Sequence, residues 1–433
     1  HVLEDWQKRE YTGLKLGVGR MKKFLALVGN PQKSFSAIHI AGTNGKGSTA
    51  CMIASILSTA GYTTGLYTSP HLVELRDRIC VNDKPISQRA LKQLVDRYEG
   101  DAQQCRLTFF EFITGIAFIY YARCGIDVAV IETGLGGRFD ATNVIADPVV
   151  CVISEIGYDH QQFLGHRLTD IAREKAGIIK KGSSVVTGVT DAGAYRVIRQ
   201  AARQKKIPVY RFATDFNGCS LRTDWAKGLQ KMVFHPGTAP VFSPSTDITV
   251  DIPFVGGHQI RNACLAVTTV SVLKDKGWDI SREHIRTGLS RARWPGRFDI
   301  RRCTRRGRVH TMVIDGAHNP QAVAAFVRSW CQSPWGNNRQ PFIFGVLKDK
   351  DYRAIIRLVA PLMSEVVLVT VSSNRALEAQ EMAVLFKKYR AIKRIATAAS
   401  VEEALEMMNH KPVVAVVGSL YLAGEVIKKW EVK

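Results

Sequence analysis

The sequence lacks the features of a membrane-spanning chain. In its 433 residues, no run reaches the roughly 18 uninterrupted apolar residues that a spanning helix needs. The closest candidate, Phe109–Tyr121, is short and contains Glu111, so we predict a buried helix there. Nothing in the first thirty residues resembles a signal peptide. We therefore expect a globular protein with no membrane partner.

Paired cysteine motifs are absent as well. The nine cysteines are an odd number, and no C-x-x-C pair occurs among them. A disulfide framework and a zinc knuckle both depend on such spacing. The scattered cysteines favour small buried side chains in a reducing compartment, and we expect a cytoplasmic protein.

Acidic residues are scarce relative to basic ones. The chain has 38 Asp and Glu against 60 Lys and Arg, a formal net charge of +22, which attracts anions in general. The densest basic stretch contains Arg301, Arg302, Arg305, Arg306 and Arg308, without the interleaved aromatic residues of a single-strand-binding surface. We interpret it as a solvated basic loop, with an anionic-substrate funnel or a nucleic-acid surface as alternatives. We expect no nucleic-acid partner.

What the sequence does contain is a glycine-rich loop between a predicted strand and a predicted helix. An apolar run ends at Ala41, and an amphipathic helical pattern opens at Ser48-Thr49 and continues to about Ala60. Backbone N–H groups in such a loop, together with a helix N-terminus, form a cradle for phosphates. We predict a nucleoside triphosphate site here, with Lys46 reaching the terminal phosphates. The cradle residues are Gly42, Thr43, Asn44, Gly45, Lys46, Gly47 and Ser48.

The loop departs from the usual P-loop spacing, G-x-x-x-x-G-K-[ST]. Gly42 and Gly45 are only three residues apart, and Gly47 separates Lys46 from Ser48. The hydroxyl that normally meets Mg2+ is therefore displaced by one residue. Either Ser48 swings in, or another loop supplies the hydroxyl.

Alternating strand and helix patterns predict an α/β protein of two domains. Within residues 1–295, near-continuous apolar runs such as Asp127–Glu132 are typical of parallel strands buried on both faces. Residues 217–254 break into short alternating runs, which predict antiparallel hairpins. After a Trp-Pro-Gly-Arg sequence the alternation restarts, and residues 296–433 are predicted to form a smaller Rossmann-like α/β domain. That domain has no G-x-G-x-x-G dinucleotide fingerprint.

Polar residues follow several predicted strands, where ligands bind in open parallel sheets. Glu132 ends a strand at a glycine-rich turn and is either a Mg2+ ligand or a structural acid. His160 follows the next strand, and local evidence favours a structural histidine. Lys175 is, on local evidence, an ordinary solvated lysine. In the second domain, Asp315 and His318 either bind ribose and phosphate or cap the following helix.

Together these motifs resemble folylpolyglutamate synthase/dihydrofolate synthase, a branch of the Mur ligase superfamily. The resemblance runs from about Leu14 to Gly424. Gly42–Ser48 with Glu132–Asn143 is specific to the folate branch, because wall-building relatives usually place Thr or Ser directly after the lysine. The motifs that carry the resemblance are Gly29–Gln32, Gly42–Ser48, Thr68–Leu72, Glu132–Asn143, Gly157–His160, Lys175–Ile178, Gly257–Gln259, Asn262-Ala263, Trp294–Asp299 and Asp315–Pro320.

For the first domain, the resemblance implies a magnesium site and a modified lysine. Glu132, His160 and the hydroxyl of Ser69 would hold Mg2+, which answers the question raised by the displaced hydroxyl. Lys175 matches a lysine that CO2 carbamylates in this superfamily, giving a carboxylate for a second Mg2+. Lys46 keeps its assignment to the phosphates.

The resemblance also implies which residues meet the rest of the nucleotide. Asn262 would lie at the adenine side, and Arg297 would contact a phosphate. Asp315 and His318 would contact the nucleotide from the C-terminal domain. Catalytic roles are thus assigned to Lys46, Lys175 and His318.

The implied reaction is ATP-dependent amide ligation. A pterin-borne carboxylate attacks the γ-phosphate to give an acyl phosphate and ADP, and the amine of L-glutamate then displaces phosphate. Dihydropteroate, reduced folates or both remain possible acceptors. The principal alternative is a Mur-type ligase acting on a peptidoglycan precursor; a P-loop ATPase or kinase and an ATP-using nucleic-acid-binding protein also remain open. A monomer is expected.

Overall fold

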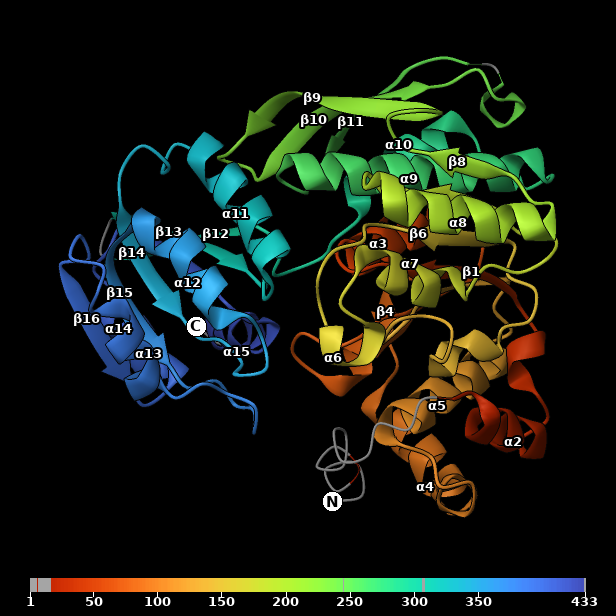
Figure 1. The fold of residues 1–433 in the computed structure, drawn as a ribbon, viewed down its shortest axis with the longest axis horizontal. Helices are drawn as coiled ribbons and strands as arrows, with labels where there is room; N and C mark the ends of the chain where they lie inside the picture. Colours follow the sequence, from red (N-terminus) through yellow and green to blue (C-terminus); the bar gives the residue numbers. More distant parts are fainter. Residues whose placement is uncertain (1–5, 7–16, 244, 306–307, 432–433) are drawn as a thin grey trace. The chain divides into compact units, whose positions relative to one another are not determined.

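The computed structural model describes residues 6, 17–243, 245–305 and 308–431, which fall into two compact units (Figure 1). The N-terminal unit takes the described residues up to Cys219 together with Val233–Val250 and Ile260–Arg293. The C-terminal unit takes Ser220–Met232, Asp251–Gln259 and the described residues from Trp294 onward. Two residues named above, Leu14 and Arg306, lie outside the described residues.

The N-terminal unit is built on an eight-stranded sheet of order β4-β3-β2-β5-β1-β6-β7-β8. Strands β2, β5, β1, β6, β7 and β8 are parallel, whereas β3 and β4 are antiparallel additions at one edge. The strands are β1 Ser36–Ala41, β2 Thr64–Tyr67, β3 Ile79–Val81, β4 Lys84–Pro85, β5 Val128–Glu132, β6 Val150–Ile153, β7 Ser184–Thr187 and β8 Val209–Arg211.

Helices pack against this sheet and enclose two cores. One core lies under α2, α4 and α5, and another under α7 and α8. The helices of this part of the chain are α2 Gly19–Leu27, α3 Lys46–Thr59, α4 Gln88–Gln104, α5 Phe109–Cys124, α6 Gln161–Leu164, α7 Leu168–Ala176, α8 Ala192–Lys205, α9 Gly257–Asp275 and α10 Arg282–Arg291. Short 3-10 helices are η1 Pro31–Lys33, η2 Leu75–Arg78, η3 Ala141–Val144 and η4 Pro240–Phe242.

A small second sheet has the order β11-β10-β9. Its strands are β9 Phe216–Asp224, β10 Leu229–Pro236 and β11 Ile248–Ile252. This confirms the prediction of a small antiparallel β region over residues 217–254.

The C-terminal unit carries a six-stranded sheet of order β12-β13-β17-β14-β15-β16, parallel except for β12. Its core is rich in aromatic and β-branched side chains from α11, α12, α13 and the sheet. The elements are β12 Asp299–Arg305, β13 Arg308–Asp315, α11 Pro320–Gln332, β14 Gln340–Phe344, α12 Tyr352–Val359, η5 Ala360–Leu362, β15 Met363–Val369, α13 Ala379–Phe386, β16 Arg394–Ala398, α14 Val401–Met407, β17 Val413–Val417 and α15 Leu420–Glu431.

Helix α5 is the buried helix predicted from Phe109–Tyr121. Thr108 and Glu111 form a reciprocal capping box at its start, and Gly125 ends it in a left-handed conformation. Glu111 is buried and also forms an ion pair with Arg20. None of the helices in the described residues combines the length and apolarity needed to cross a bilayer.

The basic stretch around Arg301 is not the loop that we predicted. Residues Asp299–Arg305 form strand β12, which pairs antiparallel with β13 at the edge of the sheet. Arg301 donates a hydrogen bond to Asp299, and Arg302 donates one to the carbonyl of Trp225. Charged side chains on an edge strand oppose pairing with other chains, so a dense run of arginines is compatible with a strand.

Two further boundaries differ from the sequence prediction. Helix α3 begins at Lys46 rather than at Ser48-Thr49, and its N-cap residue, Gly45, has a left-handed conformation. Strand β16 was not predicted, since its sequence, Arg394–Ala398, lacks the continuous apolar run of the central strands.

Candidate functional site

The glycine-rich loop lies where three strand ends meet. In the register of the sheet, Ile40 of β1 is level with Glu132 of β5, and Ala41 is level with Ile153 of β6. The loop leaves β1 directly after these positions and enters α3 at Lys46. The fold therefore gathers the loop and the residues that follow β5 and β6 at one edge of the sheet, as the sequence predicted.

Two of the loop glycines have no room for a side chain. A Cβ on Gly42 would collide with Ser154, and a Cβ on Gly45 would collide with the side chain of Asn262. Gly45 also has φ +83°, a conformation that L-residues rarely adopt. The tight contact brings Asn262, which is buried, directly against the loop.

Hydrogen bonds fix the loop to the segment that follows β6. The amide of Thr43 donates to the carbonyl of Glu155 (2.6 Å), and the Thr43 hydroxyl lies 3.0 Å from the amide of Gly157 and 3.1 Å from its carbonyl. Ser154 Oγ donates to the carbonyl of Asn44 at 2.7 Å. Because Thr43 and Asn44 are both held, the backbone of this part of the loop is arranged before any ligand arrives.

Lys46 lies between the loop and the end of β5. Its Nζ is 3.4 Å from the carbonyl oxygen of Thr43 and 3.6 Å from Oε1 of Glu132. The amide of Ser69 donates to Oε2 of Glu132 at 3.4 Å. The structure thus brings together a loop lysine, a buried carboxylate and the loop that carries the Ser69 hydroxyl.

Lys175 is buried, which differs from the solvated lysine favoured on local evidence. It lies in α7 with 3% of its surface exposed, and its Nζ donates to the carbonyl of Gly42 at 2.7 Å. Burial, together with the Lys46 cation, lowers the pKa of Lys175 to about 7, while Asp159 and Asp140 oppose the shift. A substantial fraction of this amine is therefore uncharged near neutral pH.

Asp140 and Asp159 are two acidic residues to which the sequence analysis assigned no role. Asp140 is buried; it accepts hydrogen bonds from the amide of Leu135 (2.8 Å) and the hydroxyl of Thr142 (2.6 Å). Their position after β5 and β6 is the signal that could have found them. Both are near enough to Lys175 to act on its pKa.

His160 follows Asp159 and precedes the short helix α6, in a left-handed conformation with φ 50°. Its Nε2 lies 3.9 Å from Oδ1 of Asp159, and about a third of its side chain is exposed. Among the described residues, no three His, Cys, Asp or Glu side chains converge on a point that could hold a metal. The predicted set contains only two such residues, Glu132 and His160.

The donors near Glu132 nevertheless suit Mg2+. Glu132 is a buried carboxylate, and its second oxygen faces the Ser69 loop within hydrogen-bonding distance. Mg2+ prefers oxygen ligands and usually keeps several waters, so it needs few protein ligands. A lysine amine is not such a ligand, and Lys175 could join only as a carboxylate derivative.

In the C-terminal unit, the predicted residues lie at the end of β13. Asp315 is buried, and its carboxylate accepts hydrogen bonds from the amides of Phe298 and Ala317, both at 2.8 Å. Burial raises the pKa of Asp315 to about 6, although the Arg297 guanidinium and these two amides act in the opposite direction. His318 Nδ1 is 2.9 Å from the carbonyl oxygen of Gly316, and because a carbonyl oxygen only accepts, Nδ1 is the donor in this contact.

Asn319 caps the helix that follows these residues. Its side chain accepts from the amide of Ala322 at the start of α11, and Pro320 occupies the first helical position. The capping role that the sequence left open for Asp315 and His318 therefore belongs to Asn319.

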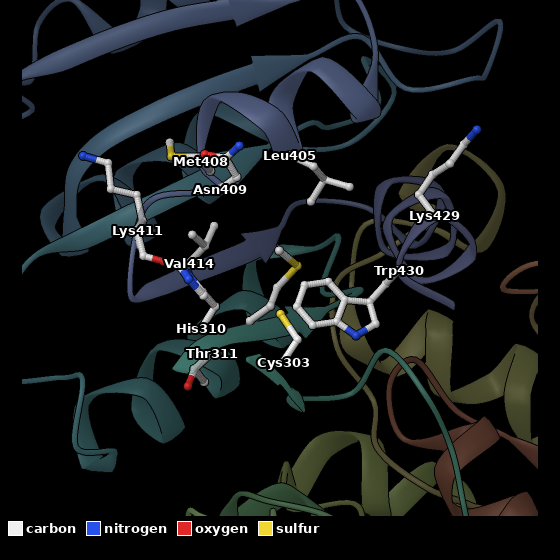
Figure 2. Close-up of a pocket in the computed structure, with 11 residues that line it drawn as sticks. Cys303, His310, Thr311, Leu405, Met408, Asn409, Lys411, Val414, Lys429 and Trp430 are labelled. Carbon is white, nitrogen blue, oxygen red and sulfur yellow. Dashed lines mark hydrogen bonds between the residues drawn. The ribbon is translucent and has the colours of Figure 1, made fainter. Parts of the chain in front are cut away.

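An open hollow lies elsewhere in the C-terminal unit (Figure 2). It is bounded by the beginning of β13, whereas Asp315 ends that strand, and the Trp430 ring and the Cys303 side chain face it. No predicted site residue lines it. The residues that do are Cys303, His310, Thr311, Met312, Leu405, Met408, Asn409, Lys411, Val414, Lys429 and Trp430.

Comparison with known proteins gives consistent matches. Residues 40–270 match the Mur ligase middle domain, and residues 296–420 match the Mur ligase glutamate ligase domain. The dihydrofolate synthase/folylpolyglutamate synthase of Bacillus subtilis is 34% identical, with 96% of this chain and 95% of that protein covered. The folylpolyglutamate synthase of Lacticaseibacillus casei is 36% identical, with 94% and 92% covered. The structure of E. coli FolC in complex with DHPP and ADP superposes with a TM-score of 0.85 at 27% identity, covering 99% of this chain and 97% of that one.

Proposed function

Since this chain belongs to the folylpolyglutamate synthase/dihydrofolate synthase branch of the Mur ligase family, we propose that it ligates L-glutamate to a pteroate or folate carboxylate while ATP is converted to ADP and phosphate. The observation that carries the proposal is the group formed by Lys46, Glu132 and Lys175 around an ordered glycine-rich loop. In such a group the Lys46 cation can offset charge on a transferred phosphoryl group while the Glu132 carboxylate can hold Mg2+, and no covalent protein nucleophile is needed.

The reaction has two steps. The acceptor carboxylate attacks the γ-phosphorus of ATP, which forms an acyl phosphate and releases ADP. The amine of L-glutamate then attacks the acyl carbon, phosphate leaves, and the amine loses a proton. Lys46, already held against Thr43 and Glu132, would offset the charge on the transferred phosphoryl group.

Mg2+ would be held by Glu132, the Ser69 hydroxyl and His160. When bound, it would neutralise charge on the phosphate oxygens. The chain's contribution is to keep the Glu132 carboxylate buried at the end of β5, with the Ser69 loop hydrogen-bonded to it. Displacement of Lys46 from Glu132 toward the phosphates would free the carboxylate for the ion.

Lys175 would be carbamylated by CO2 and would help to hold a second Mg2+. Support comes from its burial and its lowered pKa, because only an uncharged amine attacks CO2. In enzyme supplied with 13C-bicarbonate, a carbamate carbonyl signal should appear by NMR and be absent from Lys175→Arg. Identical spectra for the two proteins would exclude the modification.

The remaining nucleotide contacts are assigned to Asn262, Arg297, Asp315 and His318. Asn262 packs against Gly45 of the loop, which suits a residue on the adenine side. His318 presents an imidazole whose tautomer is set by the carbonyl of Gly316. Changing His318 to Ala should raise the KM for glutamate or lower kcat, and unchanged values would remove it from the site.

The first experiment measures glutamate-dependent ADP release with Mg-ATP and bicarbonate, comparing dihydropteroate with tetrahydrofolate as acceptor. Turnover with both would establish a bifunctional enzyme, and turnover with one would name the activity. Absence of turnover with both, combined with turnover of a sugar-nucleotide peptide, would support the peptidoglycan-precursor alternative instead.

Domain organisation, location and oligomeric state complete the proposal. We propose that residues 1–295 form the ATP- and folate-binding domain and residues 296–433 the C-terminal ligase domain. A cytoplasmic location is supported by nine cysteines that are all free thiols. We propose a monomer as the oligomeric state. Size-exclusion chromatography with light scattering would test the monomer.

A further inference from the structure

We propose that Cys219 is a reactive thiol that exchanges with low-molecular-mass disulfides, with His235 as its base and Asp247 as the residue that orients the base. The three side chains lie on or beside the small antiparallel sheet, within the N-terminal unit. None of them belongs to the proposed ligase site, so the inference holds or fails independently of the proposed function.

The sheet places His235 between the other two side chains. Strand β10, which carries His235, lies between β9, which carries Cys219, and β11, which begins directly after Asp247 (Figure 1). Nε2 of His235 is 3.9 Å from Sγ of Cys219, and Nδ1 is 2.9 Å from Oδ2 of Asp247. The two ring nitrogens therefore face a thiol on one side and a carboxylate on the other.

This arrangement assigns the protons of the imidazole ring. An ionised carboxylate only accepts, so Nδ1 carries the proton of the hydrogen bond to Asp247, and in the neutral ring Nε2 is then an acceptor. An acceptor that faces a thiol can take its proton and leave a thiolate, which is the nucleophilic form of cysteine. The Asp247 carboxylate stabilises the imidazolium that forms.

Asp247 is held in place by its own neighbourhood. Arg282 of α10 donates a hydrogen bond to the carbonyl of Asp247. The Ser245 hydroxyl donates to the carbonyl of Gly237 at 2.9 Å, which ties the segment before β11 to the residue that follows β10. The carboxylate is therefore kept beside His235, although more than half of its side chain is exposed.

Cys219 points to solvent, whereas its neighbour in the strand faces the core. A Cβ on Gly218 would lie 2.5 Å from Sγ of Cys264, a buried residue of α9. Successive strand residues point to opposite faces, so Cys219 points away from Cys264, and it is exposed. Burial raises the pKa of the Cys264 thiol and keeps it unreactive. The disulfide that exchanges with Cys219 must therefore come from solution.

The exchange balances without a further reagent. The Cys219 thiolate attacks one sulfur of the disulfide, a new S–S bond forms as the old one breaks, and the leaving thiolate takes the proton from Nε2 of His235. Cys219 is oxidised to a mixed disulfide, and one half of the reagent is reduced to a thiol. The net charge of +22 favours an anionic disulfide.

The test follows all nine cysteines by mass spectrometry while the reduced full-length protein reacts with glutathione disulfide. Cys219 should form the mixed disulfide at least about tenfold faster than Cys124 and Cys331, the other exposed cysteines. We expect less than the roughly 100-fold of a base in an enclosed active site, because this site is open to water. Equal rates at the three cysteines would overturn the proposal.

His235→Gln tests the base. Glutamine leaves a polar group beside the sulfur but cannot take a proton. The Cys219 rate should therefore fall about tenfold, while the rates of Cys124 and Cys331 in the same molecule stay unchanged. His410→Gln replaces an exposed histidine of the C-terminal unit and is the control that should leave every rate unchanged. A Cys219 rate that survives His235→Gln would also overturn the proposal.

Asp247→Asn tests the orienting carboxylate and should slow Cys219 about threefold, the effect of weakening one exposed hydrogen bond. Because Asp247 acts through the imidazole, Asp247→Asn should add no further loss to His235→Gln, and Asp247→Glu should recover part of the rate. Losses that multiply in the double variant, or a wild-type rate in Asp247→Asn, would contradict the orienting role. Unchanged rates at Cys124 and Cys331 would show that each variant is folded.

Discussion

The N-terminal and C-terminal units both place ionisable side chains at the carboxyl ends of parallel strands, but with different partners. In the N-terminal unit, Lys46 and Glu132 form an ion pair, and Lys175 donates to the backbone of the glycine-rich loop. In the C-terminal unit, Asp315 accepts from two amides of its own neighbourhood. In the N-terminal unit the charged side chains near the strand ends therefore surround a loop. In the C-terminal unit the side chain at the same topological position stabilises a backbone conformation.

Burial acts on both units by disfavouring charge. It lowers the pKa of Lys175 to about 7 and raises that of Asp315 to about 6. Burial therefore favours the neutral form of both the amine and the carboxyl group, which lowers the pKa of the amine and raises the pKa of the carboxyl group. Because the two groups titrate in different pH ranges, their contributions to the pH dependence of stability can be measured separately.

The largest expected effect is the loss of the loop cation. Lys46→Ala should lower kcat by about 100- to 1,000-fold, because one preorganised charge on the transferred phosphate is removed. Lys46→Arg is the matched control, because it keeps the positive charge but changes the shape of the side chain. It should recover part of the rate. Glutamate-dependent ADP release measures both rates. A Lys46→Ala rate within about tenfold of wild type would contradict the assignment, because removing a preorganised charge should slow the reaction by much more.

Next in size is the substitution of a loop glycine. Gly45→Ala should weaken ATP binding by about tenfold or more, since a left-handed L-residue costs about 1–2 kcal/mol and the new methyl group would meet Asn262. Gly100→Ala, in α4 with open space around it, is the control and should leave binding unchanged. Calorimetric titration with an ATP analogue compares them, and equal affinities would show that the loop tolerates a side chain.

The opposite pKa shifts predict opposite effects of pH on stability. Between pH about 7 and 10.5, Lys175 binds a proton in the unfolded chain but not in the folded one, so stability should rise with pH relative to Lys175→Met. Between pH 3.8 and about 6, Asp315 binds more protons when folded, so stability should fall as pH rises relative to Asp315→Asn. Chemical unfolding at several pH values tests both slopes; parallel curves for variant and wild type would refute the shifts.

The smallest effects compare helix caps in the two units. Asn319→Ala and Asp191→Ala each remove one N-cap hydrogen bond and should each cost about 1 kcal/mol of unfolding free energy. Asn319 adjoins His318, so its removal should also lower activity, whereas Asp191→Ala should not. Thermal unfolding and ADP release distinguish the two, and an equal loss of activity in both would remove the link between cap and site.

The elements best predicted from sequence were those whose own residues decide them. Helix α5 carries a capping box, a terminal glycine and a mostly apolar sequence, and it extends only three residues beyond the predicted range. Strand β5, Val128–Glu132, matches the predicted apolar run Asp127–Glu132 to within one residue because its side chains are nearly all apolar. Strand β12 was mistaken for a loop, because its arginines are stable in a strand only through pairing with β13.

The candidate site divides in the same way. The glycine-rich loop and Glu132 could be recognised because spacing and chain order are local properties. The burial of Lys175 could not be predicted, because it depends on contact between α7 and a loop far away in the sequence. The hydrogen bond from Lys175 to Gly42 spans 133 positions. The use of Asp315 by the Phe298 amide was hidden for the same reason.

The sequence by itself determined the fold class and the family, and it predicted a glycine-rich loop of the phosphate-binding type. These follow from apolar periodicity, glycine spacing and motif identity, which need no knowledge of distant contacts. Only the tertiary structure decided which ionisable groups are buried and which atoms they face. Solvation and hydrogen bonding act through space, so a lysine that reads as solvated in the sequence becomes an amine with a pKa of about 7 once the chain has closed around it.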